Sequence, residues 1–366
     1  MKGLYIHIPF CNSICSYCDF PKRVSNQINK KNYINSLIKE INEKKELLHN
    51  INTVYIGGGT PNSIELNDLK ELFESIKDIL KNGIENSIEL NPELITKDLL
   101  LLLKEYNFNR LSLGVQSFNP RLIKVLNRNH DKKLIIEKLN LIKEIGFNNI
   151  NIDLMFGIPT EDLNDLKEDL NIALSLDITH ISYYSLILED KTILKHKIDN
   201  NIYQEVDDDL EADMYDYINK TLKENGFNHY EISNYAKKGF ESKHNLIYWT
   251  MDEYIGVGMS AASFYNNTRF QNTLIFKEYI ENNTFYKEEL DKDELMNEYM
   301  MLGLRKTSGI SISDFVNKYN ISPLIYFKDK INHLIKINMI DIENDIIKIK
   351  EDKLFLANIA FEEFVK

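Results

Sequence analysis

Residues 11–18 read CNSICSYC and contain every cysteine of the 366-residue chain, Cys11, Cys15 and Cys18. Three thiolates so close together can bind one inorganic centre, and soft sulfur ligands favour an iron–sulfur cluster, zinc or copper(I). A cubane cluster normally takes four thiolates, so three would leave one iron open to an outside ligand, as in reactive metal sites. A zinc site completed by His7 or a carboxylate stays an alternative. Three unrelated buried thiols are a poorer explanation, because all three cysteines lie in one loop.

Around this loop, from residue 3 to about residue 185, short β-rich runs alternate with amphipathic stretches of helical spacing. Six βα units in series predict parallel strands with right-handed crossovers, in either a partial barrel or a doubly wound sheet. Periodicity does not separate these two architectures. The predicted strands are Gly3–Ile8, Thr53–Ile56, Ser87–Leu90, Arg110–Gly114, Asn149–Met155 and His180–Ser185, and the predicted helices are Tyr33–Leu48, Leu66–Leu80, Leu99–Tyr106, Lys132–Ile145 and Leu163–Leu176.

Polar and glycine-rich residues follow the ends of these strands, where the loops of barrel enzymes carry the chemistry. The glycines of GGGTP, residues 57–61, let a backbone approach a ligand and offer N–H groups to it. Glu89 and Gln116 would offer a carboxylate and an amide, and Arg128 suits a carboxylate in bidentate geometry. Asp153 lies in an otherwise apolar strand, where an unpaired charge is costly. Taken singly, each of these residues fits a structural role at least as well.

The spacing CxxxCxYC, preceded by YIHIPF at residues 5–10 and extended by YCDF at residues 17–20, resembles the radical S-adenosylmethionine (SAM) superfamily. GGGTP, the strand with Glu89, GVQSF, the NR pair and DLMFGIP resemble its HemN/HemW branch over nearly the whole chain. The resemblance implies a partial (βα)6 TIM-like barrel and a [4Fe-4S] cluster on the three cysteines, with SAM on the open iron. The residues that it assigns to the SAM pocket are Tyr5, Tyr17, Gly58, Gly59, Thr60, Glu89, Gln116, Arg128 and Asp153.

After residue 185 the alternation weakens into a charged, loop-like connector, residues 189–209, and a helix, Leu210–Glu224. Residues 229–236 alternate as on a strand. In HNLIYW, residues 244–249, a helix would place residues four apart on one face, and an imidazole beside the only Trp could ligate haem iron. A hydrogen-bonded core histidine packed against aromatic rings is the alternative. The resemblance favours haem, because HNxxYW is associated with haem binding in HemW; the residues concerned are His244, Asn245, Tyr248 and Trp249.

The segment YIGVGMSAAS, residues 254–263, is only loosely like the dinucleotide-binding GxGxxG, because no clean strand precedes it and Ala261 replaces the third glycine. We predict a close-packed loop there. From about residue 291, three helices and a hairpin around Asn344-Asp345 predict a small α+β, winged-helix-like domain that serves as a lid or docking surface. The expected division is 1–190 for the radical SAM core, 191–290 for a connector and haem-motif region, and 291–366 for the C-terminal domain.

Composition excludes several functional classes. The net charge of −12 argues against nucleic-acid binding and against a polybasic grip on a membrane. No apolar run is long enough to span a bilayer, and the first residues enter a strand rather than a signal peptide. Clustered cysteines fit a reducing cytoplasm, so we expect a cytoplasmic protein that also reaches the inner face of the membrane transiently.

The resemblance implies two candidate functions. The first is a haem chaperone of the radical SAM family that delivers haem to haem-requiring proteins, chiefly respiratory membrane enzymes, with a bacterioferritin-like haem donor and a homodimer among the expected partners. The alternative is oxygen-independent coproporphyrinogen III oxidase. HemN carries a further cysteine where this chain has Phe20, and it has an extension ahead of the cysteine loop. Together with HNLIYW, these differences favour the chaperone, without coproporphyrinogen oxidase activity; whether SAM is cleaved does not follow from the sequence.

Overall fold

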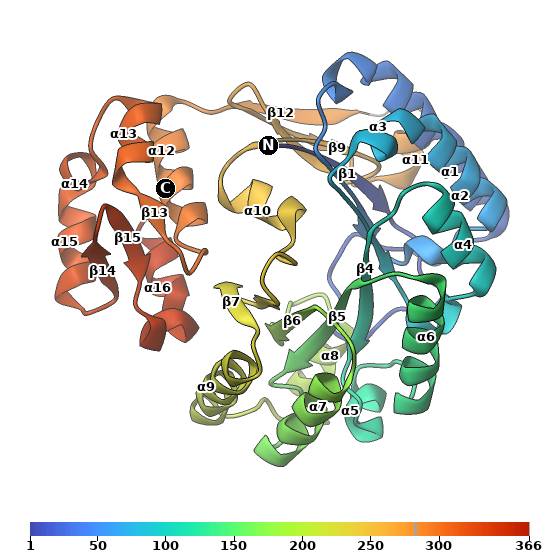
Figure 1. The fold of residues 1–366 in the computed structure, drawn as a ribbon, viewed down its shortest axis with the longest axis horizontal. Coiled ribbons are helices and arrows are strands. Elements are labelled where there is room, and N and C mark those ends of the chain that lie inside the picture. Colours follow the sequence, from blue (N-terminus) through green and yellow to red (C-terminus); the bar gives the residue numbers. More distant parts are fainter. Residues whose placement is uncertain (282–283, 366) are drawn as a thin grey trace.

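The computed structural model describes residues 1–281 and 284–365. In this part of the chain the main feature is a curved twelve-stranded sheet with the order β12-β11-β10-β9-β1-β2-β3-β4-β5-β6-β8-β7. Strands β1 to β6 are parallel neighbours in chain order, and Figure 1 shows their connecting helices on the convex side of the sheet. A doubly wound sheet would reverse its strand order at a switch point. The predicted partial (βα)6 barrel is therefore confirmed.

The six parallel strands lie within two residues of their predicted bounds, because each is a local β-rich run. They are β1 (Lys2–Ile8), β2 (Thr53–Gly58), β3 (Glu85–Leu90), β4 (Arg110–Gln116), β5 (Asn149–Phe156) and β6 (His180–Ser185). The helical elements between them are α1 (Gln27–Glu43), η1 (Lys45–Leu48), η2 (Pro61–Ser63), α2 (Leu66–Ser75), α3 (Lys77–Asn82), η3 (Pro92–Leu94), α4 (Lys97–Glu105), α5 (Pro120–Val125), α6 (Lys132–Ile145) and α7 (Leu163–Ser175).

The helix α1 begins six residues before its predicted start at Tyr33. Asn26 caps it, since its side-chain oxygen accepts a hydrogen bond from Asn29 N at 2.9 Å. Such a cap satisfies a backbone N–H that has no partner within the helix. The helix start therefore depends on a polar residue outside the apolar pattern that was used to predict it.

The two faces of the barrel strands differ in polarity. On β4, Leu111, Leu113 and Val115 are fully buried against the helices, whereas the alternate residues face a cavity on the other side. The same alternation holds along β5. Because successive side chains on a strand point to opposite faces, the outer face forms the main core. The inner face stays polar instead of filling with aliphatic side chains as in a closed barrel.

Four further strands extend the sheet beside β1, and the sequence did not predict them. They are β9 (Glu253–Val257), β10 (Ala262–Tyr265), β11 (Thr268–Asn272) and β12 (Phe285–Glu289), and helix α11 (Phe276–Glu281) lies between the last two. Our statement that no clean strand precedes the glycines of residues 256–258 is wrong, because β9 pairs in parallel with β1 there. The loop that follows is tightly packed: Gly258 has a φ of +105°, and a Cβ there would lie 2.6 Å from the carbonyl oxygen of His7.

At the opposite edge of the sheet the chain forms a hairpin, where a single strand over residues 229–236 was expected. The hairpin is β7 (Asn228–Glu231) with β8 (Asn234–Ala236), and β8 pairs with β6. The segment expected to be a connector contains a helix, α8 (Ile193–Asp199), and is followed by α9 (Asp208–Glu224). Figure 1 shows α10 (Lys243–Trp249) on the concave side of the sheet. Because β7 to β12 join the sheet of β1 to β6, the boundaries at residues 190 and 290 stay predictions.

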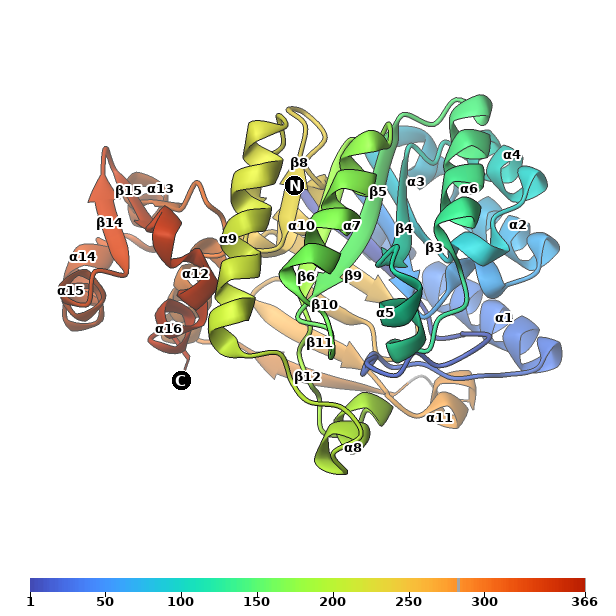
Figure 2. The same cartoon turned by 90° about the horizontal axis from the view of Figure 1, so that it is seen from below.

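The C-terminal elements form the expected small α+β unit. Figure 2 shows them grouped at one end of the molecule, beside α9. The predicted hairpin is confirmed, and its turn residues Asn344 and Asp345 have φ values of +47° and +72°, as a tight two-residue turn requires. The elements are α12 (Lys292–Gly303), β13 (Ile310–Ser311), α13 (Ile312–Tyr319), α14 (Pro323–Tyr326), α15 (Lys328–Lys336), β14 (Ile340–Glu343), β15 (Ile346–Ile349), η4 (Glu351–Leu356) and α16 (Ala357–Glu362). Across the described residues no helix combines the length and apolarity that crossing a membrane needs.

Candidate functional site

The cysteine loop follows β1 and is closed by backbone hydrogen bonds. Cys11 N donates to Arg23 O at 3.0 Å, and Arg23 N donates to Pro9 O at 2.7 Å. In the middle of the loop Ser16 donates its N–H to Leu126 O and its hydroxyl to Val125 O, which ties the loop to the end of α5. The loop is thus fixed at both ends and at its centre.

The three thiols are free, and all three line one cavity. Burial raises the pKa values of Cys11 and Cys18, so these side chains favour the neutral thiol until a metal replaces the proton. No three His, Cys, Asp or Glu side chains in the described ranges converge on a point that could hold a single metal ion. The ligands of a cubane cluster do not converge on one point, because each thiolate binds a different iron. Three cysteines on a single fixed loop fit that group.

His7 does not complete a zinc site in this structure. Its Nδ1 lies 2.9 Å from the hydroxyl of Tyr5, and its Nε2 lies 3.0 Å from the carbonyl oxygen of Pro21. Both ring nitrogens are therefore engaged, and burial lowers the pKa of the imidazole. Since Pro21 follows the last cysteine, His7 acts as a brace between β1 and the cysteine loop.

The cavity has a volume of about 410 Å³ and lies against the inner face of the sheet. It runs from the cysteine loop down the polar inner face of β3 to β6. Most of the residues predicted for the cluster and for SAM meet here. The predicted residues that line the cavity are Cys11, Cys15, Tyr17, Cys18, Gly58, Gly59, Thr60, Glu89, Gln116, Arg128, Asp153 and Asn245.

The glycine loop after β2 packs against the cysteine loop. We expected its backbone N–H groups to face a ligand, but Gly58 N donates to Glu89 at 3.0 Å, Gly59 N to Ile8 O and Thr60 N to Phe10 O. A Cβ on Gly58 would lie 2.6 Å from the His7 ring, and one on Gly59 would lie 3.0 Å from the Cys11 sulfur. The glycines are required by this close packing. The N–H groups of Gly58, Gly59 and Thr60 are therefore not free to meet a ligand.

Two half-buried carboxylates face each other across the cavity. Glu89 accepts hydrogen bonds from Tyr55 OH at 2.7 Å and from Gly58 N, and burial, reinforced by the negative charge of Asp153, raises its pKa to about 7. Asp153 accepts from Asn151 Nδ2 at 2.7 Å, and burial raises its pKa as well. Two such groups favour a ligand that brings a positive charge or hydroxyl donors.

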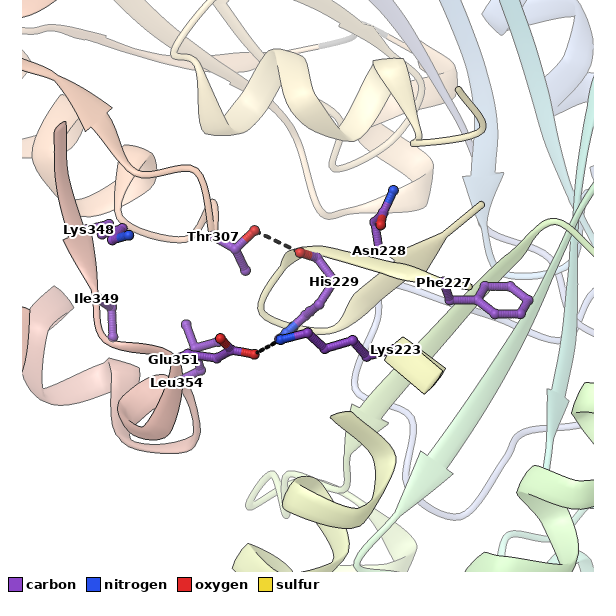
Figure 3. Close-up of a pocket in the computed structure, with 9 residues that line it drawn as sticks. All are labelled: Lys223, Phe227, Asn228, His229, Thr307, Lys348, Ile349, Glu351 and Leu354. Atoms are coloured by element: carbon purple, nitrogen blue, oxygen red, sulfur yellow. Dashed lines mark hydrogen bonds and ion pairs between the residues drawn. The ribbon is translucent and has the colours of Figure 1, made fainter. Parts of the chain in front are cut away.

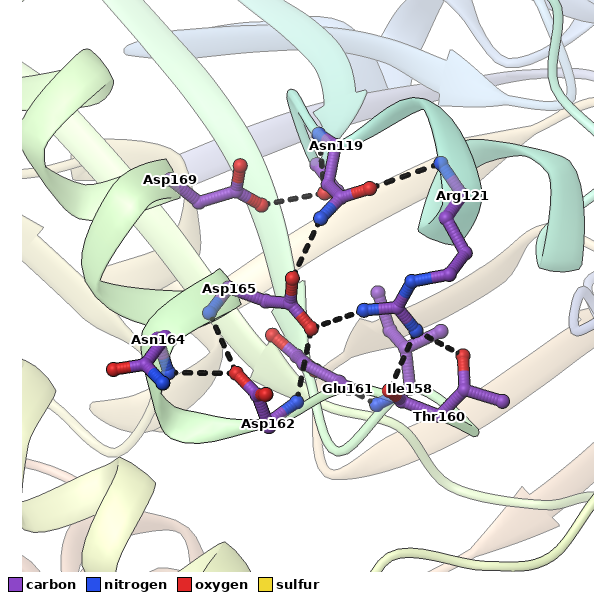
Figure 4. Close-up of polar contacts among 10 residues, drawn as sticks. Asn119, Arg121, Ile158, Thr160, Glu161, Asp162, Asn164, Asp165 and Asp169 are labelled. Carbon is purple, nitrogen blue, oxygen red and sulfur yellow. Dashed lines mark hydrogen bonds and ion pairs between the residues drawn. The ribbon is translucent and has the colours of Figure 1, made fainter.

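Gln116 ends β4 in the left-handed region of φ, at +68°, a conformation that costs a non-glycine residue free energy and is common at functional sites. Acidic residues of α7 hold the following loop in place, as Figure 4 shows. Phe118 N donates to Asp169 at 3.0 Å, and Asn119 Nδ2 donates to Asp165 at 2.7 Å. Hydrogen bonds to α7, on the outside of the barrel, therefore hold the loop that follows Gln116 and help to keep this residue in its strained conformation.

Arg128 connects the β4 loop with the cysteine loop. Its Nη2 donates to the carbonyl oxygen of Gly114 at 2.6 Å, and its Nη1 lies 3.6 Å from the sulfur of Cys15. A guanidinium beside a thiolate stabilises the ionised sulfur, and it can turn its free edge to a carboxylate. Arg128 is one of the residues that the resemblance assigns to the SAM pocket.

Four predicted residues do not line the cavity: Tyr5, His244, Tyr248 and Trp249. His244 is 1% exposed; its Nδ1 lies 2.7 Å from Thr53 Oγ1 and its Nε2 lies 2.9 Å from Tyr248 OH. Burial lowers its pKa to about 3. Neither nitrogen is free to ligate iron in this conformation, which matches the alternative of a hydrogen-bonded core histidine. The guanidinium of Arg305 lies over the ring of Trp249, with its carbon atom Cζ 4.4 Å from the centre of that ring.

A second cavity, of about 290 Å³, lies between β7 and the C-terminal hairpin (Figure 3). The ring of His229 stacks on Tyr235 at 4.3 Å, and its Nε2 lies 3.1 Å from Ile232 O. Thr307 donates its hydroxyl to His229 O at 2.7 Å. No predicted site residue is among those that line this cavity.

Sequence reasoning missed the polar residues deep in the first cavity. On β4 and β5, Arg110, Ser112 and Asn151 precede the predicted residues Gln116 and Asp153 by an even number of positions and so share their inner face. Ser182 and Tyr184 lie on β6, where no site residue was predicted, and Tyr55 lies on β2. The polar–apolar alternation of those strands was the signal that could have found them. The missed residues are Tyr55, Arg110, Ser112, Asn151, Ser182 and Tyr184.

Comparison with known proteins agrees with this geometry. The profile of the Radical SAM superfamily matches residues 5–173, and that of the HemN C-terminal domain matches residues 290–352. The solved structure of coproporphyrinogen III oxidase (HemN) from Escherichia coli superposes with a TM-score of 0.85 at 23% identity, covering 99% of this chain and 89% of that one. At that identity the likeness shows the fold.

Two curated relatives, both named heme chaperone HemW, match along the whole chain. The protein of Bacillus subtilis is 37% identical over 376 residues, which cover 100% of this chain and 99% of the relative. The protein of Lactococcus lactis is 35% identical over 370 residues, which cover 100% and 97%. With this identity over full length, and with three free cysteines of one loop facing a polar half-barrel cavity, the chain belongs to the HemW family of the radical SAM superfamily.

Proposed function

We propose that this protein is a haem chaperone that binds a [4Fe-4S] cluster, SAM and haem, and that it delivers the haem to proteins that require it. The observation that carries the proposal is that the free thiols of one loop share a cavity with Glu89, Arg128 and Asp153. The name of the two full-length relatives supports the haem part.

Cys11, Cys15 and Cys18 would hold the cluster and leave one iron open. When bound, the cluster supplies an electron to SAM. The residues of this chain would position SAM: Arg128 takes its carboxylate, while Glu89 and Asp153 take its ammonium and ribose hydroxyls. Tyr17 and the carbonyl groups of the glycine loop close the same end of the cavity.

Haem contact is proposed for the α10 motif, with His244, Asn245, Tyr248 and Trp249 as candidate residues. Only Asn245 reaches the cavity. For His244 to ligate iron, one of its hydrogen bonds must open, either the one from Nδ1 to Thr53 or the one from Nε2 to Tyr248, and because the side chain is buried its neighbours must also move. The proposed partners are haem-requiring acceptors, chiefly respiratory membrane enzymes, a bacterioferritin-like donor and a second copy of the chain. The proposed location is the cytoplasm.

One experiment separates the chaperone from the oxidase. Anaerobically reconstituted and reduced protein is incubated with SAM and coproporphyrinogen, and in parallel haem-loaded protein is mixed with an apocytochrome. We expect haem transfer to the apocytochrome and no protoporphyrinogen. Protoporphyrinogen that forms in the wild type and not in a Cys15→Ala variant would establish the oxidase instead.

A further inference from the structure

Two donor nitrogens of the buried Arg110 side chain have no hydrogen-bond partner in the described part of the chain. It is the first residue of β4 and is 2% exposed. Its Nε and Nη1 are shielded from solvent, and no group within residues 1–281 and 284–365 accepts a hydrogen bond from either atom. Removing a charge from water costs several kcal/mol unless an opposite charge and hydrogen bonds compensate for it. A guanidinium left in this state indicates a missing anion.

Arg110 lines the cavity together with Ser112, Asn151, Ser182 and Asn245, and we call these five residues the cavity floor. The neutral members are bound to one another or to neighbours: Asn151 Nδ2 donates to Ser112 Oγ at 2.7 Å, and Ser182 Oγ donates to Asn151 Oδ1 at 3.3 Å. Arg110 is the charged member of the floor.

No carboxylate of the cavity forms a hydrogen bond or ion pair with Arg110 in the described residues, although burial raises the pKa of Asp153 and the nearby charge of Arg110 partly offsets that increase. Asp153 is bound by Asn151 and Ser112, and Glu89 by Tyr55 and Gly58. The floor is also far from the cysteine loop. Arg110 precedes Gly114, whose carbonyl oxygen binds Arg128, by four positions on β4, which is about 13 Å of strand. We therefore assign the two guanidinium groups to opposite ends of the cavity.

We propose that Arg110 is the anion-binding residue of the cavity floor and that it takes a carboxylate of the molecule that enters the cavity. The planar fork of a guanidinium matches a carboxylate in two parallel hydrogen bonds. A monoanion suits the site better than a phosphate dianion, because Glu89 and Asp153 already add negative charge to the same cavity. The inference rests on the proposed function for its ligand: the carboxylate of SAM is already assigned to Arg128, so the floor would anchor a propionate carboxylate of haem.

The test compares each acid with an analogue that lacks the carboxylate. Haem is compared with haem dimethyl ester by Soret titration, and SAM with decarboxylated SAM by calorimetry. The proteins are wild type, Arg110→Gln, Arg110→Lys and the control Arg121→Gln, whose side chain lies outside the cavity in an ion pair with Asp165. We expect wild type and R121Q to prefer haem over its dimethyl ester by roughly 10- to 100-fold. R110Q should lose that preference and R110K should restore part of it. All four proteins should keep their preference for SAM over decarboxylated SAM, because Arg128 takes that carboxylate; a SAM preference that is lost in R110Q would overturn the assignment of the floor to haem.

Equal affinity of the wild type for haem and its dimethyl ester overturns the proposal, and this arm needs no variant to fold. An R110Q protein that keeps the preference for haem overturns it as well. If wild type binds neither SAM nor haem, the proposed function fails. Sodium propionate then tests whether Arg110 binds an anion independently of that function. Propionate should raise the midpoint of thermal unfolding of the wild type at concentrations that leave R110Q unchanged; an equal shift in both proteins refutes an anion site at Arg110.

Discussion

The imidazole of His244 lies 2.7 Å from the hydroxyl of Thr53, which joins α10 to the first residue of β2. On its other side the ring lies 2.9 Å from Tyr248 OH. The backbone N–H of His244 also donates to Glu85 at 2.9 Å, at the start of β3. His244 thus fastens α10 to the amino-terminal ends of two strands, opposite the end that carries the cysteine loop.

His244→Ala should lower the free energy of unfolding by about 1–3 kcal/mol, because the hydroxyls of Thr53 and Tyr248 lose their buried partner. Urea denaturation measures this loss. Tyr248→Phe is the matched control, since it removes one of the two hydrogen bonds and keeps the ring packing. In a haem titration, a weaker Soret shift in H244A than in Y248F supports a haem role for His244. Identical titrations of H244A and wild type would remove the residue from the haem site.

Alanine at Cys11, Cys15 or Cys18 should each reduce iron and labile sulfide to background after anaerobic reconstitution. Each thiolate would serve a separate iron, so two remaining thiolates hold a cubane poorly. Ser13→Ala is the matched control, because Ser13 is exposed in the same loop. Colorimetric iron and sulfide assays give the result. Stoichiometric zinc without sulfide in the wild type would replace the cluster hypothesis by the zinc alternative.

Prediction from the sequence succeeded where the signal is local. The six parallel strands, α6 and the C-terminal hairpin follow from runs of apolar spacing and from one turn. β9 could not be predicted in this way: Glu253–Val257 shows no alternation, and it is a strand because β1 offers a free edge. The hairpin of β7 and β8 likewise depends on its pairing with β6.

For the site, the sequence predicted which residues reach the cavity better than it predicted their hydrogen-bond partners. Glu89 and Asp153 do reach the cavity, as strand ends predict. The glycine loop was expected to present N–H groups, yet the donors of Gly58, Gly59 and Thr60 are all used within the protein. Which of several possible partners a polar group takes is decided by packing between segments far apart in the sequence, and no local pattern encodes it.

Gly58→Ala should destabilise the protein and lower cluster content. The residue has a φ of +114°, and the new Cβ would lie 2.6 Å from the ring of His7, which braces the cysteine loop through Pro21. Gly239→Ala is the control: its φ is +89°, and a Cβ there meets nothing within 4 Å. Alanine in a left-handed backbone conformation destabilises both variants. The difference between their free energies of unfolding therefore isolates the contact with His7. We expect G58A to lose about 1–3 kcal/mol more than G239A in urea denaturation. Equal losses would show that the contact with His7 is easily relieved.

The stability of the protein should fall as pH rises through the titration of Glu161. This side chain is 4% exposed; its Oε2 accepts from Ile158 N at 2.9 Å (Figure 4), while its Oε1 is buried without a partner in the described structure. Burial raises its pKa to about 8. A carboxyl whose pKa is higher in the folded than in the unfolded chain stabilises the fold below its unfolded pKa of about 4.3 and loses that contribution as pH rises to the folded value.

Glu161→Gln keeps an acceptor for Ile158 and cannot ionise. We therefore expect the variant to have a flatter free energy of unfolding between pH 5 and pH 8.5 than the wild type, and to be the more stable protein at the upper end. Each pKa unit corresponds to about 1.4 kcal/mol, so the difference between the two profiles should reach a few kcal/mol at most. Glu168→Gln on the exposed face of α7 is the control and should follow the wild type. Parallel profiles for E161Q and wild type across this range would mean that the loop around Glu161 admits water and that its carboxylate ionises at ordinary cost.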